Sequence, residues 1–308
     1  MAVDALERLR DAVLRSFPEW AGVGIELTPL AGGITNDNAV VSVPGLGRFV
    51  VRLPGERTEL LGIDRAHEAE AARRAAELGV GPPVLGLLDG VGTLVTELVP
   101  GVHLERAEFV ERIDEVVALL ERFHDSGPLA GAFPIHRVVE WHARDAVAHG
   151  VALPDGYPRL HALSARIEDA FRASPDAPVA CHNDLLPANV LFAAERTWLL
   201  DFEYAGMNDR YFDLANLSVN CGLDASADAW LLERYDGRVS ARGAARLSLM
   251  KLMSEFREGM WAVVQQAIST LDTDFAGYAE QRLSSAIALA DTIDLERLLC
   301  EAALPHSA

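Results

Sequence analysis

Residues 182–204, HNDLLPANVLFAAERTWLLDFEY, contain the residue types that phosphoryl transfer requires. Asn189 and Asp201 follow Asp184 by five and by seventeen residues. The apolar runs VLF and WLL lie between Asn189 and Asp201 and predict a hairpin that brings Asp201 back beside Asp184. One carboxylate can then accept a proton, while an amide and a second carboxylate hold magnesium. Phosphoryl transfer from ATP depends on this kind of positioning and charge neutralisation.

Each residue of this segment has a predicted role. Asp184 is the predicted catalytic base for a substrate hydroxyl, and Asn189 and Asp201 offer the oxygen ligands that Mg²⁺ prefers. His182 is expected to brace the loop through a ring hydrogen bond. Asp213, in RYFDLAN, is expected to support the same loop from the following helix. The alternative, an unrelated hairpin with surface acids, is disfavoured because three positions and the apolar pattern agree.

The chain divides near Pro100-Gly101, where the pattern of strands ends. Residues 1–99 predict a small lobe with a five-stranded antiparallel sheet and a helix over 64–78. Residues 100–308 are mainly helical. Helices are predicted over 105–124, 137–149, 158–172, 211–221, 226–235, 242–268 and 275–299. We therefore predict an α+β fold with two lobes, in which 1–99 bind nucleotide and 100–308 carry catalysis and substrate binding, with a cleft between them.

A glycine-rich segment in the small lobe is a candidate phosphate-binding loop. Gly32 and Gly33 permit close approach of backbone N–H groups to phosphate oxygens, and Thr35 and Asn36 add side-chain donors. An ordinary hairpin turn is the alternative interpretation of this GGITN sequence.

Further nucleotide contacts are predicted on the neighbouring strands. Arg52 lies on the third strand, where its side chain can reach the α- and β-phosphates. Glu68, at the start of the following helix, can pair with Arg52 and fix its orientation, and Glu70 is an alternative partner. Glu97 and Val99 end the last strand, where backbone groups can bind an adenine; a simple connector is the alternative.

Composition narrows the class of protein and its partners. The chain has 308 residues and a net charge of −19, which disfavours nucleic acid and anionic membranes and suits a cationic ligand. No apolar run reaches the roughly 18–20 residues of a membrane span. The three cysteines are far apart and indicate a reducing cytoplasm without a cysteine metal site. An exposed apolar patch would be compatible with a homodimer.

The sequence resembles the choline/ethanolamine kinase branch of the aminoglycoside-phosphotransferase-like kinases, which share the protein-kinase-like two-lobed fold. The similarity extends from about residue 30 to 285. HND with Asn189 resembles the superfamily's catalytic loop, and DFEYAG at 201–206 with FDLAN at 212–216 resembles the choline kinase signature. GGITN resembles the family's phosphate-covering loop, and Arg52 matches its usual arginine. The segments WAVVQ, DF and YAEQR resemble its C-terminal helices.

The sequence departs from the family at its W-x-x-W pattern. Trp261 matches the second tryptophan, but Glu258 stands in place of the first. Helical spacing predicts that residues 258, 261 and 265 face one space. Tyr204 and Trp261 are predicted aromatic walls for a quaternary ammonium, with Glu203 and Glu258 as added carboxylates. A carboxylate also accepts hydrogen bonds from a primary ammonium, so choline and ethanolamine both remain open.

The resemblance implies an ATP- and Mg²⁺-dependent kinase that phosphorylates the hydroxyl of choline. Ethanolamine kinase is the nearest alternative. A kinase for an aminoglycoside, thiamine or a sugar is another, because the shared fold does not fix the acceptor. A non-catalytic nucleotide-binding regulator is disfavoured, since it would have no reason to keep Asp184, Asn189 and Asp201 together.

Overall fold

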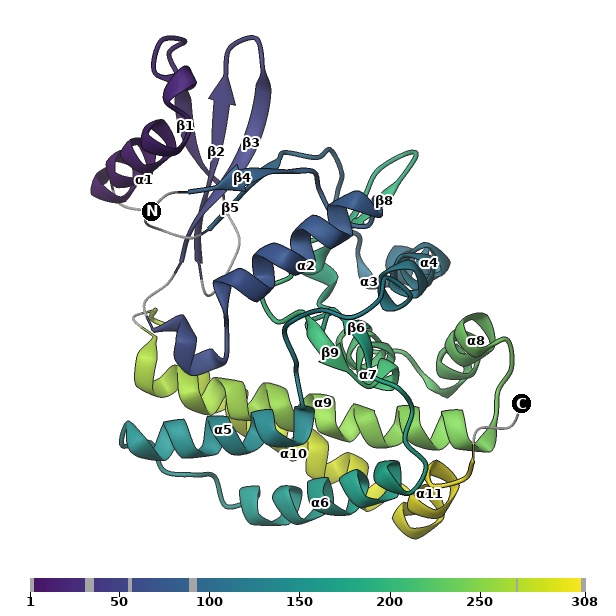
Figure 1. The fold of residues 1–308 in the computed structure, drawn as a ribbon. Helices are drawn as coiled ribbons and strands as arrows, with labels where there is room; N and C mark the ends of the chain where they lie inside the picture. Colours follow the sequence, from purple (N-terminus) through teal and green to yellow (C-terminus); the bar gives the residue numbers. More distant parts are fainter. Residues whose placement is uncertain (1–2, 31–35, 55–56, 89–92, 270, 306–308) are drawn as a thin grey trace.

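The computed structural model describes residues 3–30, 36–54, 57–88, 93–269 and 271–305. Its N-terminal part contains a sheet and its C-terminal part is mainly helical, as predicted (Figure 1). Among the described helices, none has the length and apolar composition needed to cross a bilayer.

The predicted five-stranded antiparallel sheet is confirmed, with strand order β1-β2-β3-β5-β4. Its strands are β1 Glu26–Leu30, β2 Asn36–Val43, β3 Gly47–Pro54, β4 Val84–Leu87 and β5 Leu94–Glu97. Valines in β2, β3 and β5 alternate toward a core that α1 (Val3–Ser16) and the short helix η1 (Pro18–Trp20) cover. Trp20 stacks on Phe49 at 5.2 Å between ring centroids.

Helix α2 (Arg65–Glu77) lies between the sheet and the helical part of the molecule (Figure 1). Asp64 caps its N-terminus by accepting hydrogen bonds from the backbone amides of Ala66 and His67. Glu68 lies in the first turn and is buried. The cap therefore sets the position from which Glu68 reaches the inner side of the sheet.

The C-terminal part is built around one long helix, α9, which packs against α10, α7, α5 and α11. The helices are α3 Arg106–Glu111, α4 Ile113–His124, α5 Ile135–Ala148, α6 Tyr157–Ala173, α7 Arg210–Cys221, α8 Ala225–Asp236, α9 Ala241–Ile268, α10 Phe275–Thr292 and α11 Leu295–Ala302. Gly259 allows the close approach of α9 and α10, because a Cβ there would lie 2.7 Å from the Leu283 side chain.

Two of the predicted helices are wrong in extent. The helix predicted over 105–124 is interrupted at Arg112, and the one predicted over 275–299 ends at Thr292. Asp294 starts α11 by accepting a hydrogen bond from the backbone amide of Arg297. Apolar periodicity continues across both breaks, so hydrophobic spacing alone does not reveal where the backbone turns.

The hairpin predicted between Asn189 and Asp201 is confirmed. Strand β7 (Val190–Phe192) pairs antiparallel with β8 (Thr197–Leu199). A second small sheet joins β6 (Val179–Cys181) to β9 (Gly206–Asn208), also antiparallel. Residues 182–189, which we call the catalytic loop after their predicted role, therefore leave one small sheet and enter the other, with the short helix η3 (Pro187–Asn189) at their end.

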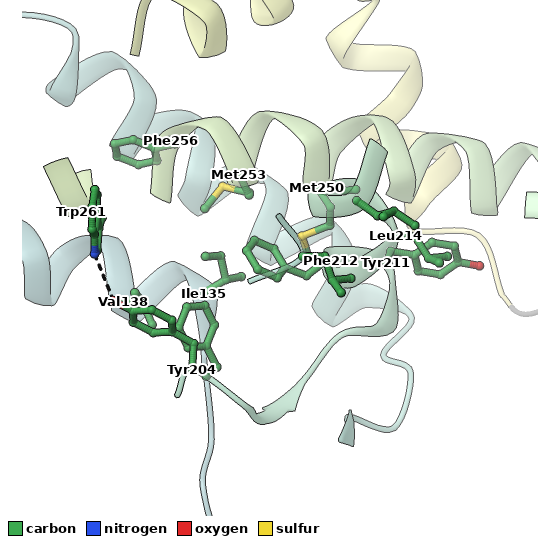
Figure 2. Close-up of a cluster of buried hydrophobic side chains, with 14 of the residues drawn as sticks. Ile135, Val138, Tyr204, Tyr211, Phe212, Leu214, Met250, Met253, Phe256 and Trp261 are labelled. Carbon is green, nitrogen blue, oxygen red and sulfur yellow. Dashed lines mark hydrogen bonds between the residues drawn. The ribbon is translucent and has the colours of Figure 1, made fainter. Parts of the chain in front are cut away.

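The core of the helical part joins α5, α7 and α9 (Figure 2). Its buried side chains include Ile135, Val138, Phe212, Leu214, Met250, Met253 and Phe256. Tyr204 and Trp261 continue this core toward the catalytic segment. The residues that carry the predicted site are thus packed on the main core.

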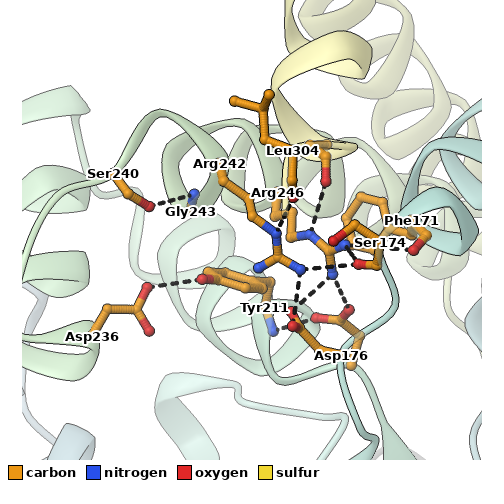
Figure 3. Close-up of polar contacts among 12 residues, drawn as sticks. Phe171, Ser174, Asp176, Tyr211, Asp236, Ser240, Arg242, Gly243, Arg246 and Leu304 are labelled. Atoms are coloured by element: carbon orange, nitrogen blue, oxygen red, sulfur yellow. Dashed lines mark hydrogen bonds and ion pairs between the residues drawn. The ribbon is translucent and has the colours of Figure 1, made fainter. Parts of the chain in front are cut away.

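Two arginines fix the start of α9 to distant parts of the chain (Figure 3). The fully buried Arg246 places Nη1 2.9 Å from Asp176 and 3.2 Å from Asp209, the N-cap of α7. Arg242 binds Asp176 at 2.9 Å and donates to the carbonyl oxygen of Leu304. The segment before β6, the start of α7 and the chain end are therefore joined at one place.

Replacing Arg246 should destabilise the protein strongly. Arg246→Met leaves Asp176 and Asp209 without their shared buried cation, and breaking such a pair costs about 3–5 kcal/mol. Urea unfolding followed by circular dichroism measures this loss. Arg166→Met, which removes an exposed pair with Glu296, is the control and should change stability little. Equal effects of the two substitutions would contradict the assigned role of Arg246.

Candidate active site

A cavity of about 970 Å³ lies between the sheet, the catalytic segment and the helices α9 and α10. It brings together most of the residues predicted from the sequence. The predicted residues that line it are Arg52, Glu68, Glu97, Val99, Asp184, Asn189, Asp201, Glu203, Tyr204, Glu258 and Trp261. Gly32, Gly33 and Thr35 lie outside the described residues, and Asn36 is the first residue of β2.

The catalytic loop is held by one buried carboxylate. Asp213 accepts hydrogen bonds from the backbone amides of His182 and Asn183, each at 2.7 Å. Its Oδ2 also lies 3.0 Å from Nε2 of His124. The His182 ring in turn donates from Nε2 to the carbonyl oxygen of Leu200 at 2.9 Å. The supporting roles predicted for Asp213 and His182 are therefore confirmed.

The carboxylate of Asp184 is oriented through both of its oxygens. Asn189 donates from Nδ2 to Oδ2 at 3.2 Å and to the backbone carbonyl of Asp184 at 2.9 Å. The guanidinium of Arg257 lies 3.2 Å from Oδ1. Asp184 is 9% exposed, and this burial raises its pKa to about 6. Arg257 opposes that rise, while nearby Glu258 adds to it.

Arg52 and Arg65 gather three carboxylates at what we call the phosphate end of the cavity. Arg52 Nη1 lies 2.8 Å from Asp201, 3.3 Å from Glu68 and 3.5 Å from Glu203. Arg65 Nη1 lies 2.6 Å from Glu68 and 3.5 Å from Glu203. Burial works against the charge of Arg52, but the three carboxylates outweigh it and raise its pKa above the usual range. The predicted pairing of Arg52 with Glu68 is present.

One expectation at this end changes with the structure. Glu70, the alternative partner of Arg52, instead accepts a hydrogen bond from the backbone amide of Ala130 at 2.9 Å. Glu203, predicted to hold the substrate head group, lies 3.5 Å from both Arg52 and Arg65 at this end. Its contact with a substrate stays a prediction.

Aromatic side chains gather in another part of the cavity lining, which we call the acceptor end after the role predicted for Tyr204 and Trp261. Trp261 donates from Nε1 to the hydroxyl of Tyr204 at 3.0 Å (Figure 2). Its ring packs nearly perpendicular to those of Phe275 and Tyr278, with centroids 5.9 Å and 6.5 Å away. The guanidinium carbon of Arg257 lies 4.4 Å from the centroid of the Tyr204 ring. The ring of Tyr204 therefore already has a cation beside it, the guanidinium of Arg257.

Glu258 is held at the acceptor end by a chain of polar contacts. Its Oε2 accepts from Arg257 at 2.9 Å, and its Oε1 accepts from the Tyr278 hydroxyl at 2.9 Å. Nε of Arg282 donates to that hydroxyl oxygen at 3.0 Å, and Arg282 also pairs with Glu255 at 3.2 Å. The carboxylate of Glu258 is thus fixed before any substrate binds.

Sequence reasoning missed Arg257 and misplaced Gln265. The helical spacing that selected Glu258 and Trp261 was not extended to Arg257, although Arg257 lies four residues before Trp261 and shares a face with it. Gln265 was predicted to face the same space, but among the described residues it does not line the cavity. The sequence does contain a signal for Arg257, which is its charge within an otherwise apolar helix. A charged residue that is buried in such a helix rarely lacks a partner.

Comparison with known proteins assigns the family. The sequence model of the phosphotransferase enzyme family matches residues 26–248, which is most of the chain. The crystal structure of a choline/ethanolamine kinase family protein from Mesorhizobium loti is 31% identical and has a TM-score of 0.81. The match covers 96% of this chain and 99% of that protein. This chain belongs to the choline/ethanolamine kinase family.

Other relatives of this kinase family member also match most of the chain. Protein LicA of Haemophilus influenzae is 27% identical over 272 residues, which cover 85% of this chain and 79% of LicA. Ethanolamine kinase 2 of Mus musculus is 26% identical over 298 residues, which cover 87% of this chain and 77% of the mouse protein. The chain is therefore a kinase that transfers phosphate from a nucleotide to an alcohol.

Changing Asp213 to asparagine should loosen the catalytic loop of this kinase. In Asp213→Asn the side-chain NH₂ group replaces one carboxylate oxygen and faces one of the two backbone N–H groups. That N–H then lacks an acceptor, and an unsatisfied buried group costs about 1–3 kcal/mol. We expect a lower melting temperature together with lower turnover. The control is Asp169→Asn on the exposed face of α6, which should affect neither. A fully stable and active Asp213→Asn protein would show that the loop is fixed by other contacts.

Proposed function

We propose that this kinase uses ATP and Mg²⁺ to phosphorylate the hydroxyl of a small cationic amino alcohol. The observation that carries the proposal is the meeting of Asp184, Asn189 and Asp201 in the cavity that also contains Glu258 and Trp261. Choline, the acceptor predicted from the sequence, belongs to this class, and so does ethanolamine. Both carry a hydroxyl two carbons away from a cationic nitrogen.

We assign the role of general base to Asp184. The acceptor oxygen attacks the γ-phosphorus, the bond to the β–γ bridging oxygen breaks, and ADP leaves. The hydroxyl proton passes to the Asp184 carboxylate. With a pKa of about 6, this carboxylate is mostly ionised at neutral pH and can accept that proton. Its contacts with Asn189 and Arg257 hold it in one orientation.

The donor set at the phosphate end fits a magnesium ion. The amide nitrogen of Asn189 is turned to Asp184, so its amide oxygen points the other way, and Asp201 adds a carboxylate. When bound, Mg²⁺ supplies charge neutralisation on the β- and γ-phosphates. Arg52, now paired with Asp201, is the guanidinium that we assign to the phosphate oxygens.

Nucleotide recognition is assigned to the rest of the sheet. The Glu97 amide donates to the carbonyl of Pro83 at 2.9 Å, so we assign adenine recognition to the Glu97 carbonyl and the Val99 amide. The covering of the phosphates by residues 32–36 stays a prediction. So does the division of labour between residues 1–99 and 100–308.

An assay of ADP release tests the function. The purified protein is supplied with MgATP and, in turn, choline, ethanolamine, an aminoglycoside, thiamine and a simple sugar. We expect acceptor-dependent ADP release with the amino alcohols. Asp184→Ala should remove nearly all of this turnover while ADP binding, measured by calorimetry, stays close to that of the wild type.

Two outcomes would contradict this function. Release of ADP only with an aminoglycoside, thiamine or the sugar would assign a different acceptor class. Unchanged turnover in Asp184→Ala would refute the role of this residue as the base. The calorimetric measurement separates both from a protein that has merely failed to fold.

A further inference from the structure

The carboxylate of Glu258 is placed to meet the charged group of an acceptor bound at Asp184. Glu258 is only 8% exposed, yet it lines the same cavity as Asp184. A single nitrogen of Arg257 lies 3.2 Å from one carboxylate and 2.9 Å from the other. The two acids are therefore close neighbours. A molecule with its hydroxyl and its nitrogen on adjacent carbons can place one at each.

Glu258 has hydrogen-bonding capacity to spare in this position. An ionised carboxylate offers about four lone-pair sites. The contacts from Arg257 and Tyr278 use one site on each oxygen. Because Arg282 and Glu255 brace Tyr278, the carboxylate cannot easily turn away from a new donor. Glu258 is thus a preorganised acceptor for further N–H groups.

The aromatic rings nearby are less well arranged for a quaternary ammonium. Such a cation has no N–H and is held mainly by ring faces. The guanidinium of Arg257 already occupies a cation position over Tyr204, at 4.4 Å. Trp261 is fixed by its hydrogen bond to Tyr204 and by perpendicular contacts with Phe275 and Tyr278. Both predicted aromatic walls are therefore already engaged by contacts within the protein.

We propose that Glu258 selects the acceptor head group, and that it favours an ammonium that keeps at least one N–H over a quaternary one. This inference rests on the proposed function, since it requires an amino alcohol with its hydroxyl at Asp184. It reverses the preference for choline predicted from the sequence. A quaternary head would still be attracted by the charge of Glu258. It would bury the free lone pairs of that carboxylate without a donor, however, which is unfavourable.

A methylation series of acceptors tests the proposal. The series is ethanolamine, N-methylethanolamine, N,N-dimethylethanolamine and choline, and kcat/KM is measured for each at saturating MgATP. The dimethyl compound keeps one N–H and choline keeps none. We expect wild-type kcat/KM to fall about tenfold or more at this last step, because a site built to hydrogen-bond its substrate discriminates against an analogue without the donor.

Variants of the acceptor end assign the effect to Glu258. Glu258→Gln keeps the shape and removes the charge, and should shrink the ratio of kcat/KM between dimethylethanolamine and choline to about one-third or less of the wild-type value. Tyr278→Phe removes one brace of the carboxylate and should shrink the same ratio to a smaller extent. Glu280→Gln, an exposed position on the same helix as Tyr278, is the matched control and should leave the ratio unchanged.

The outcomes separate this inference from the proposed function. The selection by Glu258 is refuted if choline and dimethylethanolamine have equal kcat/KM values. It is also refuted if Glu258→Gln leaves the ratio of these two values unchanged. In both cases the kinase assignment stands. If none of the four acceptors supports ADP release, the proposed function is refuted, and this inference with it. Should Glu258→Gln fail to fold, the wild-type series and Tyr278→Phe still decide.

Discussion

The buried carboxylate of Asp213 is the constraint on which the catalytic geometry depends. It binds the backbone amides of His182 and Asn183, the two residues that precede Asp184. Asp213 can do this because α7 begins at a fixed place, where its N-cap, Asp209, is paired with the buried Arg246. The residues after α11, the segment before β6 and the catalytic loop are thereby joined through one set of contacts. The position of Asp184 therefore depends on all of these contacts together.

A second theme is the pairing of buried charges inside the cavity. Charges are stable in such a place only when they have partners. Arg52 and Arg65 pair with the acids of the phosphate end, and Arg257 pairs with both Asp184 and Glu258. In both places a protein cation lies where the function we propose would bring another: a magnesium ion at one end and an ammonium at the other.

The sequence predicted the parts of this structure that local patterns encode. The hairpin after Asn189 and the five-stranded sheet are encoded by short apolar, strand-forming runs, and both are confirmed. The break before α11 escaped prediction because the apolar spacing runs through it. Arg257 escaped because its partners Asp184 and Tyr204 are distant in sequence. Tertiary packing brings Arg257, the neighbour of Glu258 on α9, into contact with both of them.

The position of the divalent ion in a crystal structure with Mg²⁺ and a non-hydrolysable ATP analogue is the most direct test of the site. We expect the ion to be bound by the side-chain oxygens of Asn189 and Asp201 and by the phosphates, with Arg52 moved from Asp201 to a phosphate oxygen. An ion bound away from both residues, with the γ-phosphate remote from Asp184, would contradict the assignment of this cavity as the phosphoryl-transfer site.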